Sequence, residues 1–466
     1  MSQNLVSSFQ IFASARIVRH PPRSSERNPW VKTIAILILL GALIGGGIFY
    51  FRDTEKPRIA LSPEAGAVSA KRPLRLQLED PGSGLDSIEV VAVQGEKSFP
   101  VFSENYGSET RFREIELGLQ DAALKDGSFE LRVTATDHSV YHFGAGNAAE
   151  ETFVLEFDSR APVLSVATSA HNLNQGGSAL IVYTISEEVD RTGVMVGDYF
   201  FPGYLQESGN YACFFALPYH TSPKQFAPEL IAEDRAGNER RTDFYHHANP
   251  RSFPSGRINL DERFLKTLQP RFEPFFPEAA APLDLFLKVN RELRKENVEA
   301  LRDFGRQTDS GPLWEGVFLR QPNAAHLGGF AAARSYFYEG KEVDQQTHLG
   351  VDLASVAQAP IPAANAGKVV HADDLGIYGK CVIIDHGMGL QSLYGHLSRI
   401  DVEKGETIAK GQIIGTSGAT GLAGGDHLHF EIILSGMSVN PVEWWDPAWL
   451  KNNVVDKLKL GARDGK

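Results

Sequence analysis

The stretch GGDHLHFEI, residues Gly424–Ile432, places two histidines at the start of an apolar run. The run continues as HFEIIL, and an apolar run of this length next to glycines is typical of a buried β-strand. Side chains at positions i and i+2 of a strand point to the same face. His427 and His429 are therefore expected to project together into one pocket.

Two further segments carry residues that bind metals or protons. His348 and Asp352 are spaced H-x-x-x-D in THLGVDLA, and His396 follows Tyr394-Gly395 in LYGHLS. Two imidazoles and one carboxylate suit zinc. Three protein ligands leave one position for water, whose pKa zinc lowers toward neutrality. Histidines outside the ligand set would then act as acid–base groups or stabilise an oxyanion.

Each of these motifs is weak evidence alone, because most H-x-H pairs are surface or core histidines. Together they lie within 82 residues, in segments bounded by glycines, and this combination favours a metal site. Three other histidines of the region, His326, His371 and His386, have no matching motif. We expect these three to be hydrogen-bonded structural residues.

The region from about Trp314 to Trp445 resembles the lysostaphin/LytM-like zinc metallopeptidases, which cut peptidoglycan crosslinks. The resemblance covers under a third of the chain and rests on THLGVDLA, CVIIDHGMGLQSLYGHLS, VEKGETIAKGQIIGTSGATG and GDHLHFEI followed by VNPVEWW. It implies a small, mostly antiparallel β domain with the site in a groove between loops.

The same resemblance implies roles for five residues. His348, Asp352 and His429 would bind Zn²⁺. His427 and His396 would be the catalytic residues, which handle the water and the developing oxyanion. Some relatives in the family have lost ligands and only activate other hydrolases, whereas this chain keeps all five positions.

The glycine-rich part of this region has a second resemblance, to half of a biotinyl or lipoyl carrier domain. A carrier needs a modifiable lysine at an exposed hairpin tip, typically beside Met or Asp. Neither Lys404 nor Lys410 has that setting in VEKGETIAKGQIIG. A carrier would also leave the histidines unexplained.

The whole chain is predicted to be mainly β, and residues 57–250 contain an internal repeat. DTEKPRI at 53–59 matches DSRAPVL at 158–164, an offset of 105 residues. A repeat of about 100 residues fits an immunoglobulin-like sandwich. The predicted divisions are a cytoplasmic basic segment 1–32, a transmembrane anchor 33–51, Ig-like domains 57–160 and 161–250, a helical connector 251–310, the zinc metallopeptidase domain 311–447 and a C-terminal tail 448–466. The Ig-like domains are read as spacers, with a binding role as the alternative.

The connector is rich in Pro and Phe up to residue 281, and Pro282 then opens a helical pattern, LDLFLKVNRELRKENVEALRDF. Its apolar residues fall near one stripe, which predicts an amphipathic helix packed on a neighbour. They are Phe286, Val289, Leu293, Ala300, Leu301 and Phe304. This helix or an Ig-like domain could also hold the site closed.

The run Thr33–Phe51, TIAILILLGALIGGGIFYF, has 19 residues and no charge. As a helix it would span about 28 Å, close to the thickness of a bilayer core. Five basic residues precede it, which places residues 1–32 in the cytoplasm. A cleaved signal peptide would have a shorter apolar run, so a single uncleaved anchor is the prediction.

Charge and cysteines narrow the class of protein. The chain of 466 residues has a net charge of −12, made of +5 in residues 1–52 and −17 in the other 414. Nucleic-acid binders normally carry a basic excess, so none is expected as a partner. Two cysteines exclude a disulfide scaffold and a four-cysteine zinc site. Cys213 and Cys381 fall in different predicted domains and are expected to be buried free thiols.

The predicted function is a membrane-anchored zinc endopeptidase, held in the cytoplasmic membrane with its catalytic domain exported. Its substrate would be the peptide part of peptidoglycan, cut by zinc-activated water without a covalent intermediate. A regulatory protein partner would fit such an enzyme. The alternatives are a non-catalytic zinc-containing scaffold or activator of other wall hydrolases, and a binding module built on the Ig-like repeat.

Overall fold

The structure is a computed structural model that describes residues 29–463. Almost all of the predicted cytoplasmic segment 1–32 lies outside these residues. The described chain is mainly β, as predicted, with one long apolar helix near its beginning. It divides into two compact units: residues up to Glu64, Leu74–Leu117 and Glu130–Val154 form the first, and Ala65–Pro73, Gly118–Phe129 and the residues from Leu155 onward form the second.

The apolar run forms helix α1 (Pro29–Tyr50). The helix begins four residues before the start of the predicted span Thr33–Phe51 and ends one residue before the end of that span. Within the described residues, Trp30–Tyr50 is the helix that is long and apolar enough to cross a membrane, with a mean hydropathy of 2.2. Its side chains are exposed rather than packed, for example Leu37, Ile38 and Ile48.

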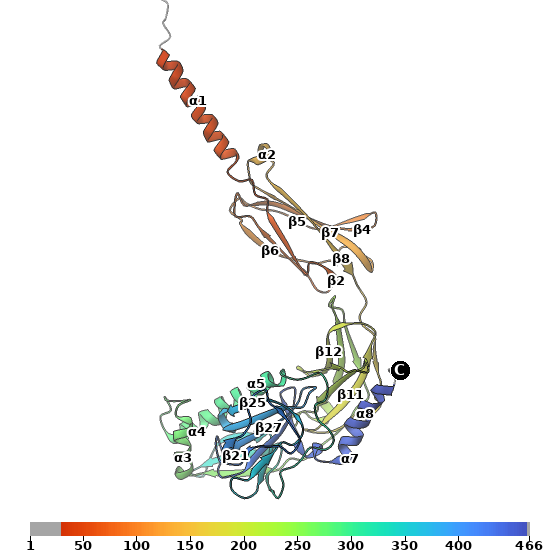
Figure 1. The fold of residues 1–466 in the computed structure, drawn as a ribbon, viewed down its shortest axis with the longest axis vertical. Coiled ribbons are helices and arrows are strands. Elements are labelled where there is room, and N and C mark those ends of the chain that lie inside the picture. The colour runs from red at the N-terminus through yellow and green to blue at the C-terminus, as the bar shows by residue number, and fades with distance from the viewer. Residues whose placement is uncertain (1–28, 464–466) are drawn as a thin grey trace, which may run out of the picture. The chain divides into compact units, whose positions relative to one another are not determined.

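Strands between residues 58 and 157 form two sheets (Figure 1). One has the order β1-β3-β6 and the other β2-β8-β7-β4-β5. In β3 the leucines at 74, 76 and 78 are buried and alternate with exposed polar residues, the pattern of a sheet with one face in the core. The elements are β1 (Arg58–Ser62), β2 (Gly66–Val68), β3 (Leu74–Glu79), β4 (Leu85–Gln94), β5 (Lys97–Asn105), β6 (Phe112–Leu117), β7 (Gly127–Asp137), α2 (Tyr141–Gly144) and β8 (Ala148–Phe157).

Strands between residues 164 and 249 form two four-stranded sheets and a short parallel pair. Their orders are β14-β15-β11-β9, β13-β12-β16-β17 and β10-β18. The immunoglobulin-like classification of both regions stays a prediction. The elements are β9 (Leu164–Val166), β10 (Asn172–Asn174), β11 (Ser178–Ile185), β12 (Val189–Val196), β13 (Tyr199–Pro202), β14 (Tyr204–Leu205), β15 (Tyr211–Ala216), η1 (Pro223–Gln225), β16 (Pro228–Asp234), β17 (Glu239–Asp243) and β18 (His247–Asn249).

The predicted amphipathic helix is present as α4 (Pro282–Lys288), a π-helical turn η2 (Val289–Leu293) and α5 (Arg294–Gly305). Its stripe, which includes Phe286 and Leu301, packs with Tyr336, Ile377 and Leu393 in one core.

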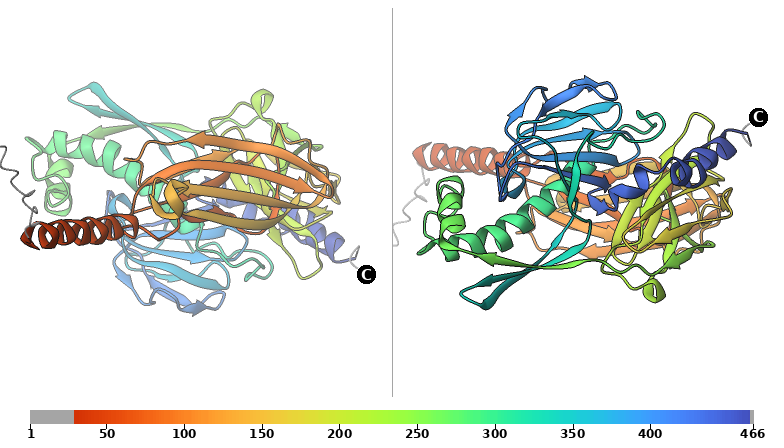
Figure 2. Two further views of the ribbon diagram at one scale, coloured as in Figure 1. Left: turned by 90° about the horizontal axis from the view of Figure 1, so that it is seen from above. Right: turned by 90° about the horizontal axis from the view of Figure 1, so that it is seen from below.

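The residues just before this helix, expected only as a connector, form a strand and a further helix. They are β19 (Ser255–Leu260) and α3 (Glu262–Phe272), and the Asp261 carboxylate caps α3 by accepting from the Phe264 amide at 2.7 Å. Figure 2 shows these helices beside the strands of the C-terminal region.

An eight-stranded sheet dominates the C-terminal region, with the order β20-β23-β31-β27-β26-β25-β29 and with β32 paired to β31. Every residue of the central strand β27 is buried, because the core that includes α3, α4 and α5 covers one face and the core that includes β11 and β15 covers the other. A second sheet, β19-β21-β22, pairs β19 in parallel with β21. The strands are β20 (Ala325–Gly328), β21 (Ala332–Tyr338), β22 (Lys341–His348), β23 (Val351–Ala354), β24 (Pro360–Pro362), β25 (Gly367–Asp374), β26 (Lys380–Asp385), β27 (Leu390–Leu397), β28 (Arg399–Ile400), β29 (Thr407–Ile408), β30 (Ile413–Thr416), β31 (Leu428–Leu434) and β32 (Met437–Val439), with the 3₁₀ turn η3 (Gly376–Tyr378).

The segment named as a tail is helical and packed over its described part. Leu450 and Val454 are buried, and the Lys457 ammonium donates to the Leu180 carbonyl of β11 at 3.1 Å. The elements are α6 (Pro441–Trp444), α7 (Pro447–Leu450), η4 (Lys451–Val455) and α8 (Asp456–Arg463).

Trp444 is expected to be a main contributor to the stability of this core. Its side chain is fully buried, and its ring lies 5.5 Å from Phe214 and 5.4 Å from Phe318. Trp444→Ala should lower the free energy of unfolding by about 3–5 kcal/mol. Urea unfolding followed by far-UV circular dichroism measures this free energy, because the signal does not depend on the fluorescence of the indole that the substitution removes.

The matched control is Val442→Ala, two residues away and 43% exposed. It should change the free energy of unfolding by less than about 0.5 kcal/mol. Equal, small effects of the two substitutions would contradict the packing role of Trp444.

Candidate metal centre

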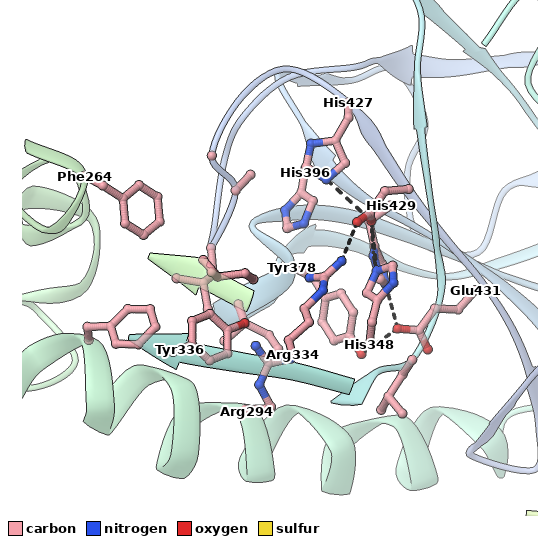
Figure 3. A pocket seen from close by; sticks show the side chains of 18 of the residues that line it. Phe264, Arg294, Arg334, Tyr336, His348, Tyr378, His396, His427, His429 and Glu431 are labelled. Atoms are coloured by element: carbon pink, nitrogen blue, oxygen red, sulfur yellow. Dashed lines mark hydrogen bonds and ion pairs between the residues drawn. The ribbon is translucent and has the colours of Figure 1, made fainter. Parts of the chain in front are cut away.

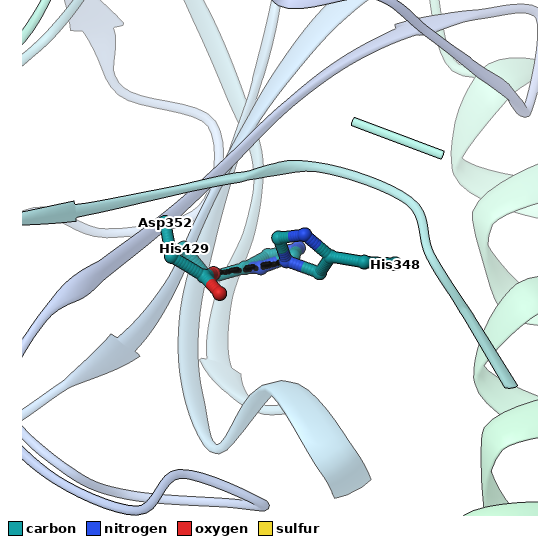
Figure 4. Close-up of side chains that lie close together, drawn as sticks. All are labelled: His348, Asp352 and His429. Carbon is teal, nitrogen blue, oxygen red and sulfur yellow. Dashed lines mark hydrogen bonds and ion pairs between the residues drawn. The ribbon is translucent and has the colours of Figure 1, made fainter. Parts of the chain in front are cut away.

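Three of the predicted ligands converge at one point. His348 ends β22, Asp352 lies on β23, and His429 lies on β31 directly opposite Asp352 in the antiparallel pair. His348 Nε2 is 2.9 Å from Asp352 Oδ1 and 3.0 Å from His429 Nδ1. His429 Nδ1 is 2.9 Å from Asp352 Oδ1, and all three side chains are buried (Figure 4).

This donor set fits a zinc ion. Ligands 2.0–2.1 Å from a tetrahedral centre are about 3.3 Å apart, slightly more than the 2.9–3.0 Å between the three atoms here. Two imidazole nitrogens and one carboxylate oxygen are also the donor types that zinc prefers. Three groups of potential ligands occur within residues 29–463, and this is the one that contains histidines.

The second ring nitrogen of each ligand histidine is held by an acceptor. His348 Nδ1 donates to the Gly329 carbonyl at 2.9 Å, and His429 Nε2 donates to Glu431 Oε1 at 2.8 Å. Glu431 is itself fully buried and accepts from the Tyr378 hydroxyl at 2.9 Å. Such acceptors fix the tautomer that presents the other nitrogen to a metal.

The two predicted catalytic histidines lie beside the ligands. His396 Nδ1 donates to the Thr420 carbonyl at 2.9 Å, and His427 Nδ1 donates to the Gly425 carbonyl at 2.8 Å. Their rings are 4.9 Å apart, and His427 Nε2 is 3.5 Å from Asp352 Oδ1. Both side chains line one cavity (Figure 3), so both Nε2 atoms are placed to accept or donate a proton there.

The surroundings of His348 and His396 favour neutral imidazoles, and those of Asp352 favour an ionised carboxylate. Burial and the neighbouring histidines lower the pKa of His396 well below 6.5, and burial lowers that of His348. Burial opposes ionisation of Asp352, yet hydrogen bonds from His348, His427 and His429 hold its pKa well below its usual range.

His429 differs from the other histidines of the site. Burial favours its neutral form, but the carboxylates of Asp352 and Glu431 raise its pKa to about 9. The position therefore favours a positive charge, as a bound cation would supply.

The cavity beside the donors has a volume of about 490 Å³. Segments that precede the five histidine and aspartate residues in the sequence form its other wall: β19, α3, the α4–α5 helix and β21 contribute Ile258, Phe264, Phe286, Arg294, Arg334 and Tyr336.

Three polar members of the site were not predicted from the sequence: Arg334, Tyr378 and Glu431. Arg334 Nη2 donates to Asp352 Oδ2 at 2.7 Å. Glu431 could have been found, since it follows His429 by two residues on the same strand face.

The three other histidines of the region were predicted to be structural residues, and the two cysteines to be buried free thiols. His386 is buried, with Nδ1 2.7 Å from the Ala366 carbonyl and Nε2 2.7 Å from Ser392 Oγ, and His371 Nε2 lies 3.1 Å from the Asp373 carbonyl. His326 is exposed on β20 instead. Cys213 and Cys381 are buried free thiols, as predicted.

Comparison with known proteins assigns the class of this region. Residues 346–441 match the model of Peptidase family M23. The DD-carboxypeptidase/endopeptidase Mpg of Neisseria meningitidis is 38% identical over 95 residues, which are 20% of this chain and 22% of that protein. The peptidoglycan DD-endopeptidase ShyA of Vibrio cholerae is 40% identical over 96 residues, 21% of this chain and 22% of that protein.

Among solved structures, a putative peptidase M23 from Pseudomonas aeruginosa is 25% identical, with a TM-score of 0.36, over 58% of this chain and 93% of that one. The match to each of the two curated relatives spans about a fifth of its length. The C-terminal region of the chain is thus a Peptidase M23 domain, and the predicted family resemblance is confirmed for that region.

Proposed function

We propose that the chain is a zinc-dependent endopeptidase that hydrolyses peptide crosslinks of peptidoglycan. The observation that carries the proposal is the convergence of His348, Asp352 and His429 within 3.0 Å of one another, beside two further imidazoles that open into a cavity. The names of the relatives, which are peptidoglycan endopeptidases, support the substrate class.

Each residue of the centre has a distinct proposed role. His348, Asp352 and His429 would hold the zinc ion. When bound, zinc would act as a Lewis acid that lowers the pKa of water and polarises the scissile carbonyl. His427 and His396, whose Nδ1 atoms are fixed by backbone carbonyls, take the proton from the attacking water and pass one to the leaving amine. Arg334 holds Asp352 in place through its second oxygen.

Helix α1 is proposed as a single membrane anchor. Its length and exposed apolar surface fit a bilayer span. Arg16, Arg19, Arg23, Arg27 and Lys32 precede or begin it in the sequence, which favours a cytoplasmic N-terminus and an exported M23 domain. The strands between residues 58 and 249 would then separate the M23 domain from the membrane along the chain.

Digestion of purified wall sacculi tests the proposed activity. The full chain in detergent should convert crosslinked muropeptides into monomers, each cut releasing one amine and one carboxyl group that mass spectrometry identifies. A chelator should stop the conversion. Unchanged crosslinks after incubation with the zinc-loaded chain would contradict the proposal and favour a non-catalytic role.

A further inference from the structure

Arg294 is a charged side chain of the cavity that the proposed chemistry does not use. It lies at the start of α5, and Figure 3 shows its guanidinium among the residues of the pocket. Nε and Nη2 donate to the Asn290 carbonyl at 3.2 Å and to Asn290 Oδ1 at 2.7 Å. Within residues 29–463, no carboxylate forms an ion pair with it.

The acids near Arg294 already have other partners. Asp344 pairs with Arg291 at 2.9 Å and accepts from Asn290 at 2.7 Å. Asp352, in the cavity wall, pairs with Arg334.

Glu431, the other acid of the cavity wall, is also saturated. It accepts hydrogen bonds from His429, Tyr378 and Ser438. Among the charged side chains of the described cavity wall, Arg294 is therefore one that has no ion-pair partner.

The surroundings strengthen the attraction of this guanidinium for an anion. Phe264, Phe286 and Ile258 form the apolar part of the same wall. Burial lowers the pKa of Arg294, but a guanidinium stays protonated in proteins. A half-buried charge without a partner is costly, and this cost is relieved when a ligand supplies the opposite charge.

We propose that Arg294 forms a subsite that binds a free carboxylate of the substrate peptide next to the amide that is cut. The inference rests on the proposed function, because the metal centre and Arg294 line one cavity and so would contact the same short peptide. Arginine matches the planar geometry of a carboxylate through parallel hydrogen bonds. Substrates whose nearby carboxylates are blocked should be poor substrates.

A matched pair of synthetic substrates tests the subsite: a crosslinked peptide dimer with free carboxylates and the same dimer with carboxamides. The full zinc-loaded chain should hydrolyse the acid form with a kcat/KM about 10- to 100-fold higher. Arg294→Gln should remove this preference by lowering the kcat/KM of the acid form toward that of the carboxamide form, and a far-UV circular dichroism spectrum and a zinc content equal to those of the wild type would show that the variant is folded. Arg294→Lys should retain part of the preference.

Lys295→Gln is the control, since it removes a positive charge from the adjacent residue, whose side chain is 78% exposed and does not line this cavity. It should keep the full preference. Equal hydrolysis of both dimers by the wild type, or an undiminished preference in Arg294→Gln, would overturn the subsite alone. Hydrolysis of neither dimer by the wild type would overturn the proposed function together with the subsite.

Discussion

Asp352→Asn is expected to remove zinc from the protein and to lower crosslink hydrolysis about 1,000-fold or more. The Asp352 carboxylate is the shared acceptor of the centre: Oδ1 lies 2.9 Å from both His348 and His429, and Oδ2 accepts from Arg334 at 2.7 Å. An amide has no charge and only one acceptor oxygen. It would weaken metal binding and leave the Arg334 guanidinium without its counterion.

Metal analysis of the dialysed protein and digestion of sacculi measure the two effects together. Asp373→Asn is the matched control, because Asp373 is exposed on β25 and outside the cavity. It should keep both zinc and activity. Full zinc content in Asp352→Asn would contradict the assignment of Asp352 as a ligand.

His427→Ala and His396→Ala are expected to separate proton transfer from metal binding. Each should lower kcat by about 100- to 10,000-fold while the zinc content stays at the wild-type level. The reason is geometric, since the ring of each is anchored by a backbone carbonyl at Nδ1 and only Nε2 is left for chemistry. His429→Ala, by contrast, should lose the metal.

The control for these variants is His371→Ala. His371 is partly exposed on β25. Its ring lies 4.9 Å from the ring of Phe304, and it does not line the cavity. This variant should retain kcat and zinc. Loss of zinc in His427→Ala would instead show that His427 belongs to the ligand set, and an unchanged kcat would remove it from the mechanism.

One part of the candidate metal centre followed from a local rule in the sequence, whereas its proposed ligand set came from the family resemblance. The i, i+2 alternation predicted one face for His427, which directly precedes β31, and His429, which lies on it. The register that brings Asp352 opposite His429 is seen only in the structure. The same alternation reaches Glu431, although the apolar run around it suggested only a core strand.

The opposite wall of the cavity could not be predicted in this way. Arg334 lies near His348 because β21 pairs in antiparallel with β22, with Ala332 opposite His348. Ile258 reaches the cavity because β19 pairs in parallel with β21, where Ser255 lies opposite Ala333, 78 residues later in the chain, and such long-range pairing leaves no local pattern. Helix α3 was missed because Pro270 lies inside it and the surrounding Pro- and Phe-rich composition is typical of a connector. The sequence pattern placed Arg294 correctly on a helix, but the direction in which its side chain points depends on how that helix packs.

Zinc reconstitution with wall sacculi is the most direct test of a zinc-dependent endopeptidase at this site. The full chain, stripped with a chelator, should leave crosslinked muropeptides intact, and restoring zinc should convert them to monomers. His427→Ala, loaded with zinc in the same way, should leave them crosslinked. Cleavage that is equal in the stripped chain, the reconstituted chain and the variant would contradict a zinc-dependent endopeptidase at this site, and so would intact crosslinks in the reconstituted wild type.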